Sequence, residues 1–163
     1  MRLLPITCLF TILGAAAAPV TAAQHQHGSA DQRAHAVMGF DQERTTHHFV
    51  LFTDGGAIDV AVKDRADARN RDAIRSHLPH LAAMFGSGDF DAPMLVHDAR
   101  NVPGTVTMAA RKAAIVYRYV ETPNGGRVDI RTSDRDALEA VHAFLKYQIA
   151  EHKTGDPLTP RPR

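Results

Sequence analysis

Residues 54–60 read Asp-Gly-Gly-Ala-Ile-Asp-Val, and residues 124–130 read Asn-Gly-Gly-Arg-Val-Asp-Ile. Gly, Asn and Asp tolerate the backbone angles of tight hairpin turns. β-Branched and aromatic residues alternate on both sides of each stretch, as they do in strands. They are Val50, Phe52, Ile58, Val60 and Val62 around the first, and Tyr117, Tyr119, Val128 and Ile130 around the second. The sequence therefore predicts two β-hairpins that repeat one pattern.

A run of apolar residues at helical spacing follows each hairpin. The first run contains Ile74, Leu78, Leu81 and Phe85, and the second contains Leu138, Val141, Leu145 and Ile149. Ser133 or Asp134 is available to cap the second helix at its N-terminus. Pro79 interrupts the first run and predicts a kink, or a helix start near Ser76.

Together these elements predict an α+β fold: a pseudo-duplicated ββα-ββα chain with a four-stranded, mainly antiparallel sheet and two helices packed on one face. The alternative is a chance resemblance between the two halves.

We expect one α+β domain over residues 47–152. Residues 24–46 and 153–163 predict flexible flanks, because the first is rich in Gln, His and charge and the second in Pro. Residues 86–112 predict a long loop with a short strand at 94–96, and such a loop often carries function.

The N-terminus has the order of a secretory signal peptide. Met1-Arg2 precedes an apolar run over residues 3–18, and small residues follow up to Ala23. The run is shorter than the roughly 20 residues of a membrane span. We expect residues 1–23 to be a signal peptide cleaved after Ala22 or Ala23, with an uncleaved anchor as the alternative. This predicts a periplasmic or secreted protein with no stable membrane anchor after cleavage.

Composition excludes several classes of function. Cys8, the only cysteine, lies within the predicted signal peptide, so the mature chain has no disulfide, thiolate nucleophile or Cys-based zinc site. Lys and Arg number 19 and Asp and Glu 18, so the charge balance does not indicate a nucleic-acid partner. Ten histidines are the one compositional excess, and histidine is the commonest metal ligand.

A set of His and Met residues predicts a metal site. On a helix of about 100° per residue, His77, His80 and Met84 form one stripe beside the apolar face. The segment that follows supplies Met94 and His97. The first strand supplies either His47 or His48, because adjacent strand residues point to opposite faces.

Imidazole and thioether ligands favour copper, and Cu(I) in particular. The alternative is that these residues merely lie at the rim of the core, where Met84 fills space. His25 and His27 form a further pair that could capture Cu(II) or Ni(II) weakly.

Two other functions stay open. One is a non-metal ligand-binding or protein-interaction module that uses the sheet face or residues 86–112. The other is an enzyme of unknown reaction. We expect this less, because no Gly-x-Ser-x-Gly, phosphate-binding loop or His-Glu-x-x-His is present. Its candidate acid/base groups are the matched pair Asp59 and Asp129, or the set Asp89, Asp91, His97 and Asp98. A metal site requires the His and Met side chains to converge, whereas an organic-ligand site requires an apolar pocket under the long loop.

Three stretches carry a family resemblance: the run from His35 to Phe49, the segment from Ile74 to Phe90, and the ending from Phe144 to His152. Together they resemble a family of small exported bacterial proteins of unsettled function. The label aspartate carbamoyltransferase is sometimes attached to such sequences. This sequence does not support that activity, because the chain is far too short for that two-domain enzyme and lacks its Ser-Thr-Arg-Thr phosphate loop.

Overall fold

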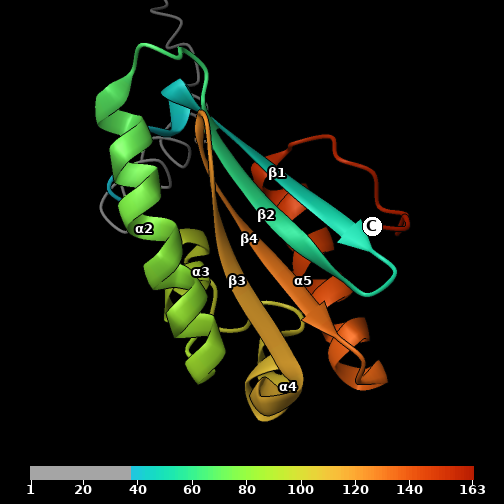
Figure 1. Cartoon of the computed structure of the whole chain (residues 1–163). Helices are drawn as coiled ribbons and strands as arrows, with labels where there is room; N and C mark the ends of the chain where they lie inside the picture. Colours follow the sequence, from blue (N-terminus) through green and yellow to red (C-terminus); the bar gives the residue numbers. More distant parts are fainter. Residues whose placement is uncertain (1–37) are drawn as a thin grey trace, which may run out of the picture.

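The computed structural model describes residues 38–163, so the predicted signal peptide and the pair His25 and His27 lie outside the described residues. Four strands, four α-helices and two 3-10 helices follow in chain order (Figure 1). They are η1 (Gln42–Arg44), β1 (Thr45–Phe52), β2 (Gly55–Val62), α2 (Ala68–Ser87), α3 (Asp91–His97), α4 (Thr105–Ala110), η2 (Lys112–Ala114), β3 (Ile115–Thr122), β4 (Gly125–Thr132) and α5 (Arg135–His152). None of these helices is long and apolar enough to cross a membrane.

The strands form one antiparallel sheet in the order β1-β2-β4-β3. Both predicted hairpins are present, and β2 and β4 join them at the centre of the sheet. The predicted α+β class and the four-stranded antiparallel sheet are therefore confirmed. Because consecutive residues of a strand point to opposite faces, the register assigns each side chain to one of two surfaces.

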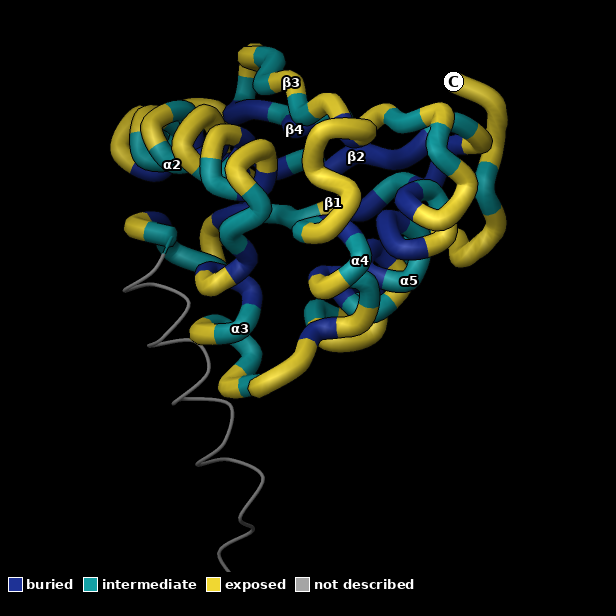
Figure 2. Tube along the Cα trace, turned by 90° about the horizontal axis from the view of Figure 1, so that it is seen from below, coloured by how far each residue is buried: buried dark blue, intermediate teal, exposed yellow. Residues whose placement is uncertain are grey.

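The inner face of the sheet is the one that packs against helices. It carries Thr45, His47, Phe49 and Leu51 from β1, Ile58, Val60 and Val62 from β2, Ile115, Tyr117 and Tyr119 from β3, and Val128 and Ile130 from β4. In the view along the strands, α3, α4 and α5 lie on one side of the sheet and α2 lies beside β3 and β4 (Figure 2). The outer face is the opposite surface.

Two glycines let the helices approach the sheet. A Cβ atom built on Gly56 would lie 2.1 Å from Cδ1 of Leu145 on α5. One built on Gly126 would lie 3.0 Å from Cδ1 of Leu78 on α2. Side chains at these two positions would push against Leu145 and Leu78, so the Gly-Gly pairs favour close approach of the helices as well as the turns.

The helix ends follow from local hydrogen bonds. Asp134 caps α5 by accepting from the backbone N–H of Ala137 at 2.9 Å, so the second of the two predicted caps is the one used. Asp67 caps α2 by accepting from the N–H of Asn70 at 3.2 Å. α2 therefore begins well before Ser76 and continues through Pro79, which is exposed, so solvent can reach the carbonyl that the proline leaves without a donor.

The prediction of a loop with a short strand over residues 86–112 is wrong. The segment forms α3, which includes residues 94–96, and α4. Glycine and proline suggested a loop, but Pro93 lies in the first turn of α3, where a missing N–H costs little, and Gly104 precedes α4. Val102 and Met108 are fully buried and fix this segment to the core.

Both expected flexible flanks make specific contacts within the described residues. Phe40 is buried in the core, and the N–H of Asp41 donates to Asn70 Oδ1 at 2.9 Å. At the other end, the N–H of Arg161 donates to the carbonyl of Leu51 at 3.1 Å, which places the tail along the free edge of β1. The C-terminal tail differs from the expectation because the free edge of β1 has backbone N–H and C=O groups to which the tail can hydrogen-bond.

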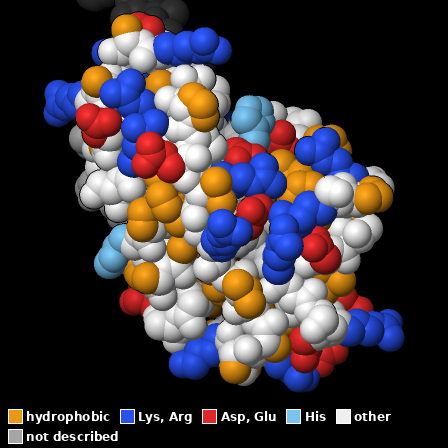
Figure 3. Space-filling view, viewed as in Figure 1, with side chains coloured by type: hydrophobic (Ala, Val, Ile, Leu, Met, Phe, Trp, Pro, Cys, Tyr) orange, Lys and Arg blue, Asp and Glu red, His pale blue; other side chains and the backbone are white. Residues whose placement is uncertain are grey.

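Arginine and aspartate side chains gather on the outer face (Figure 3). Arg127 contacts Asp59 at 3.0 Å and Asp129 at 2.9 Å. Arg163 of the tail contacts Asp129 at 2.8 Å, and its guanidinium lies 4.3 Å from the centre of the Phe52 ring. Asp59 and Asp129, the matched candidates for acid/base chemistry, are therefore both held in ion pairs with arginines.

We expect Arg163→Ala to lower the free energy of unfolding by about 1–2 kcal/mol, because it removes a partly buried ion pair and a cation–π contact. Arg131→Ala is the matched control, since Arg131 is an exposed residue of β4, and we expect it to change stability by less than about 0.5 kcal/mol. Urea unfolding of both variants measures the difference. Equal midpoints would show that Arg163 does not hold the tail.

Candidate functional site

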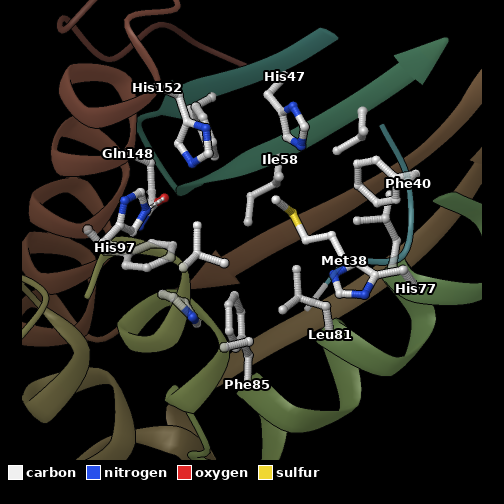
Figure 4. Close-up of a pocket in the computed structure, with 17 residues that line it drawn as sticks. Met38, Phe40, His47, Ile58, His77, Leu81, Phe85, His97, Gln148 and His152 are labelled. Carbon is white, nitrogen blue, oxygen red and sulfur yellow. Dashed lines mark hydrogen bonds between the residues drawn. The ribbon is translucent and has the colours of Figure 1, made fainter. Parts of the chain in front are cut away.

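A pocket lies between the inner face of the sheet and helices α2, α3 and α5 (Figure 4). We call it the histidine pocket, and the space within it that the centre of a water molecule can occupy is about 60 Å³. Its walls are mostly apolar, with four imidazoles and one amide among them. The lining residues are Met38, Phe40, His47, Phe49, Ile58, Val60, His77, Leu78, Leu81, Phe85, Ala92, Pro93, Val96, His97, Phe144, Gln148 and His152.

Three of the four imidazoles are successive neighbours. The rings of His47 and His152 stack with centroids 5.4 Å apart, and the rings of His152 and His97 meet edge to face at 5.1 Å. His77 stands apart from them and packs against Phe40. Figure 4 shows His97, His152 and Gln148 side by side on α3 and α5, with His47 opposite on β1.

The environment keeps three of these imidazoles, His47, His77 and His152, in the neutral state. Burial, with smaller contributions from the nearby His152, His77 and His48, lowers the pKa of His47 to about 3. Burial and the nearby His97 lower the pKa of His152 to about 4. Burial, with His80 as a smaller cause, also lowers the pKa of His77. At neutral pH His47, His152 and His77 therefore offer uncharged nitrogens rather than positive charge.

Two polar atoms in the pocket wall are buried without a protein partner among the described residues. They are Nε2 of His47 and Nε2 of Gln148. The other amide atom of Gln148, Oε1, lies 2.9 Å from Nε2 of His97. An amide oxygen only accepts, so the His97 nitrogen donates here and the Gln148 NH₂ group is left without a partner. Buried polar groups without partners are uncommon, because each costs free energy.

The structure gathers only part of the predicted metal set. His47, His77 and His97 line the histidine pocket. The other four do not line it. His48 contacts Asp156 at 2.9 Å on the outer side of the sheet, and His80 is exposed. Met84 on α2 and Met94 on α3 are partly buried outside the pocket. Within residues 38–163, no group of three or more His, Cys, Asp or Glu side chains is arranged to hold a metal ion. A copper site stays a prediction.

Sequence reasoning missed His152, Gln148 and Met38. Phe144, Gln148 and His152 recur every four residues on α5, so a signal was available: two polar residues continue a helical stripe that begins with an aromatic one. Met38 fell in a segment expected to be flexible, and only tertiary contacts place it in the pocket. Of the acid/base set proposed for residues 89–98, only His97 reaches the pocket.

The chain matches no protein family, no curated protein and no solved structure. The resemblance to a family of small exported proteins stays a prediction. Function must therefore be argued from the histidine pocket itself.

Proposed function

We propose that this protein is exported to the periplasm or secreted, and that it binds a small, mostly apolar molecule in the histidine pocket. The N-terminal order of charge, apolar run and small residues supports export. The observation that carries the binding proposal is the pair of unsatisfied polar atoms, on His47 and Gln148, in the wall of a mostly apolar cavity. A concave apolar site with a few convergent polar groups is the usual form of a small-molecule site.

Filling the pocket tests the proposal. Val96 of α3 lines the histidine pocket, whereas Val106 of α4 is 73% exposed and does not. We expect methylcyclohexane to shift the backbone amide resonances of pocket residues in the wild type. We expect Val96→Phe to weaken this binding at least tenfold, because the added ring occupies the cavity.

Val106→Phe is the matched control, and we expect it to retain wild-type affinity because the same change is made on the surface. The measurement is a titration followed by two-dimensional ¹H–¹⁵N NMR on the mature chain. Binding that is equal in the two variants would place the hydrocarbon outside the pocket and refute the proposal.

A second candidate function is binding of Cu(I). The observation that favours it is the series of neighbouring rings from His47 through His152 to His97, with Met38 lining the same pocket. The rings would need to turn to bring their nitrogens onto one ion. We propose a Cu(I) competition assay on the wild type and His152→Phe. Sub-micromolar binding lost in the variant supports copper, and binding unchanged in the variant rejects this site.

A further inference from the structure

The histidine pocket contains no charged side chain. None of its seventeen lining residues is Asp, Glu, Lys or Arg. An acidic group near its polar end is Glu151, whose Oε2 lies 3.9 Å from His97 Nδ1 and whose side chain is 46% exposed to solvent. Transferring an unpaired charge into such surroundings is costly. An anionic or cationic ligand would therefore lack a partner for its charge.

All of the polar lining residues except His77 lie at one end of the pocket. Gln148 and the neighbouring His97 and His152 lie on α5 and α3, and His47 faces them from β1 (Figure 4). The opposite part is bounded mainly by apolar side chains such as Leu81, Phe85 and Met38, with the imidazole of His77 beside them. A ligand that fits both parts has a hydrocarbon body and one polar head.

The hydrogen-bonding state of Gln148 specifies that head. Its Oε1 is occupied by the N–H of His97, so its remaining capacity is to donate through Nε2. The neutral ring of His47 can also present an N–H at its unpartnered Nε2. The Gln148 NH₂ group calls for a ligand that accepts hydrogen bonds, and His47 is a second donor in the tautomer that carries its proton on Nε2.

We infer that the histidine pocket takes an uncharged molecule with a compact hydrocarbon body and a hydrogen-bond-accepting carbonyl head, which Gln148 and His47 recognise. This inference rests on the proposed function and names the class of ligand. A ketone, aldehyde, lactone or ester of small size has this chemistry. A carboxylate or an amine of the same size does not.

A matched series of six-membered rings tests the inference by NMR titration of the mature chain. We expect cyclohexanone to bind about tenfold more tightly than methylcyclohexane, because its oxygen satisfies donors that are otherwise buried without partners. We expect no detectable binding of cyclohexanecarboxylate or cyclohexylamine at the same concentrations. Gln148→Leu should lower the ratio of cyclohexanone affinity to methylcyclohexane affinity from about tenfold to about twofold.

Gln148→Met and His47→Phe are second variants of similar volume, so the test survives if Gln148→Leu fails to fold. Equal affinity for ketone and hydrocarbon would overturn the inference while leaving the proposed function intact. Tightest binding of the carboxylate or the amine would also overturn it. Failure of both cyclohexanone and methylcyclohexane to bind would instead refute the proposed function, and the inference with it.

Discussion

Lowering the pH from 7 to 4 is expected to reduce the free energy of unfolding by several kcal/mol, with His47 and His152 as the main imidazole contributors. Their pKa values in the folded chain are about 3 and about 4, below the ordinary value of 6.5. Below pH 6.5 the unfolded chain therefore binds protons that the folded chain does not, and stability falls as the pH falls. The loss approaches about 1.4 kcal/mol per pH unit for each imidazole.

Single substitutions separate this effect from the titration of carboxylates. We expect His47→Phe, which keeps an aromatic ring beside Phe40 and Phe49, to flatten the pH dependence between pH 6.5 and 4. His80→Phe is the matched control, because His80 is exposed on α2, and we expect it to retain the wild-type slope. Urea unfolding at several pH values gives the slopes. A slope for His47→Phe equal to that of the wild type would contradict the buried, neutral state of this imidazole.

Gly104→Ala is expected to cost roughly 3 kcal/mol or more of stability. Gly104 has a φ of +86°, and a Cβ atom placed there would lie 2.1 Å from the carbonyl oxygen of Ala140 on α5. The substitution therefore adds a backbone clash to the strain of a left-handed conformation. Since Gly104 opens α4, the clash would push α4 away from α5.

Gly39→Ala provides the matched control for backbone strain. Gly39 has a similar φ of +75°, but nothing lies within 4 Å of a Cβ atom built there. We expect this variant to lose about 1 kcal/mol, which is the cost of the conformation alone. Thermal and urea unfolding of both variants measure the difference. If the two losses are the same, the close packing of α4 on α5 is not what requires glycine at position 104.

The sheet could be predicted because its signals are local. Alternating residues and the Gly-Gly pairs specify two hairpins, and β-hairpins form between neighbouring segments of the chain. The positions of α3 and α4 could not be predicted in this way. These short helices hold few periodic residues of their own, and their structure depends on the burial of Val102, Met108 and Phe90 against distant segments.

The candidate site was only partly predictable. Sequence alone indicated that either His47 or His48 faces the site, and the choice follows from the register, since His47 shares its face with the buried Phe49. Of the predicted helical stripe of His77, His80 and Met84, only His77 lines the histidine pocket. His152 comes into contact with His47 through the packing of α5 on β1, and no local pattern encodes that contact.

The most direct test of the account is an intermolecular NOE experiment on the mature chain with methylcyclohexane. We predict NOEs from the hydrocarbon to the side-chain methyl groups of Ile58, Val60, Leu78 and Leu81, which line the histidine pocket. NOEs confined to the exposed Val106, Val116 and Leu158, or no NOEs at all, would contradict the claim that this pocket binds a small apolar molecule.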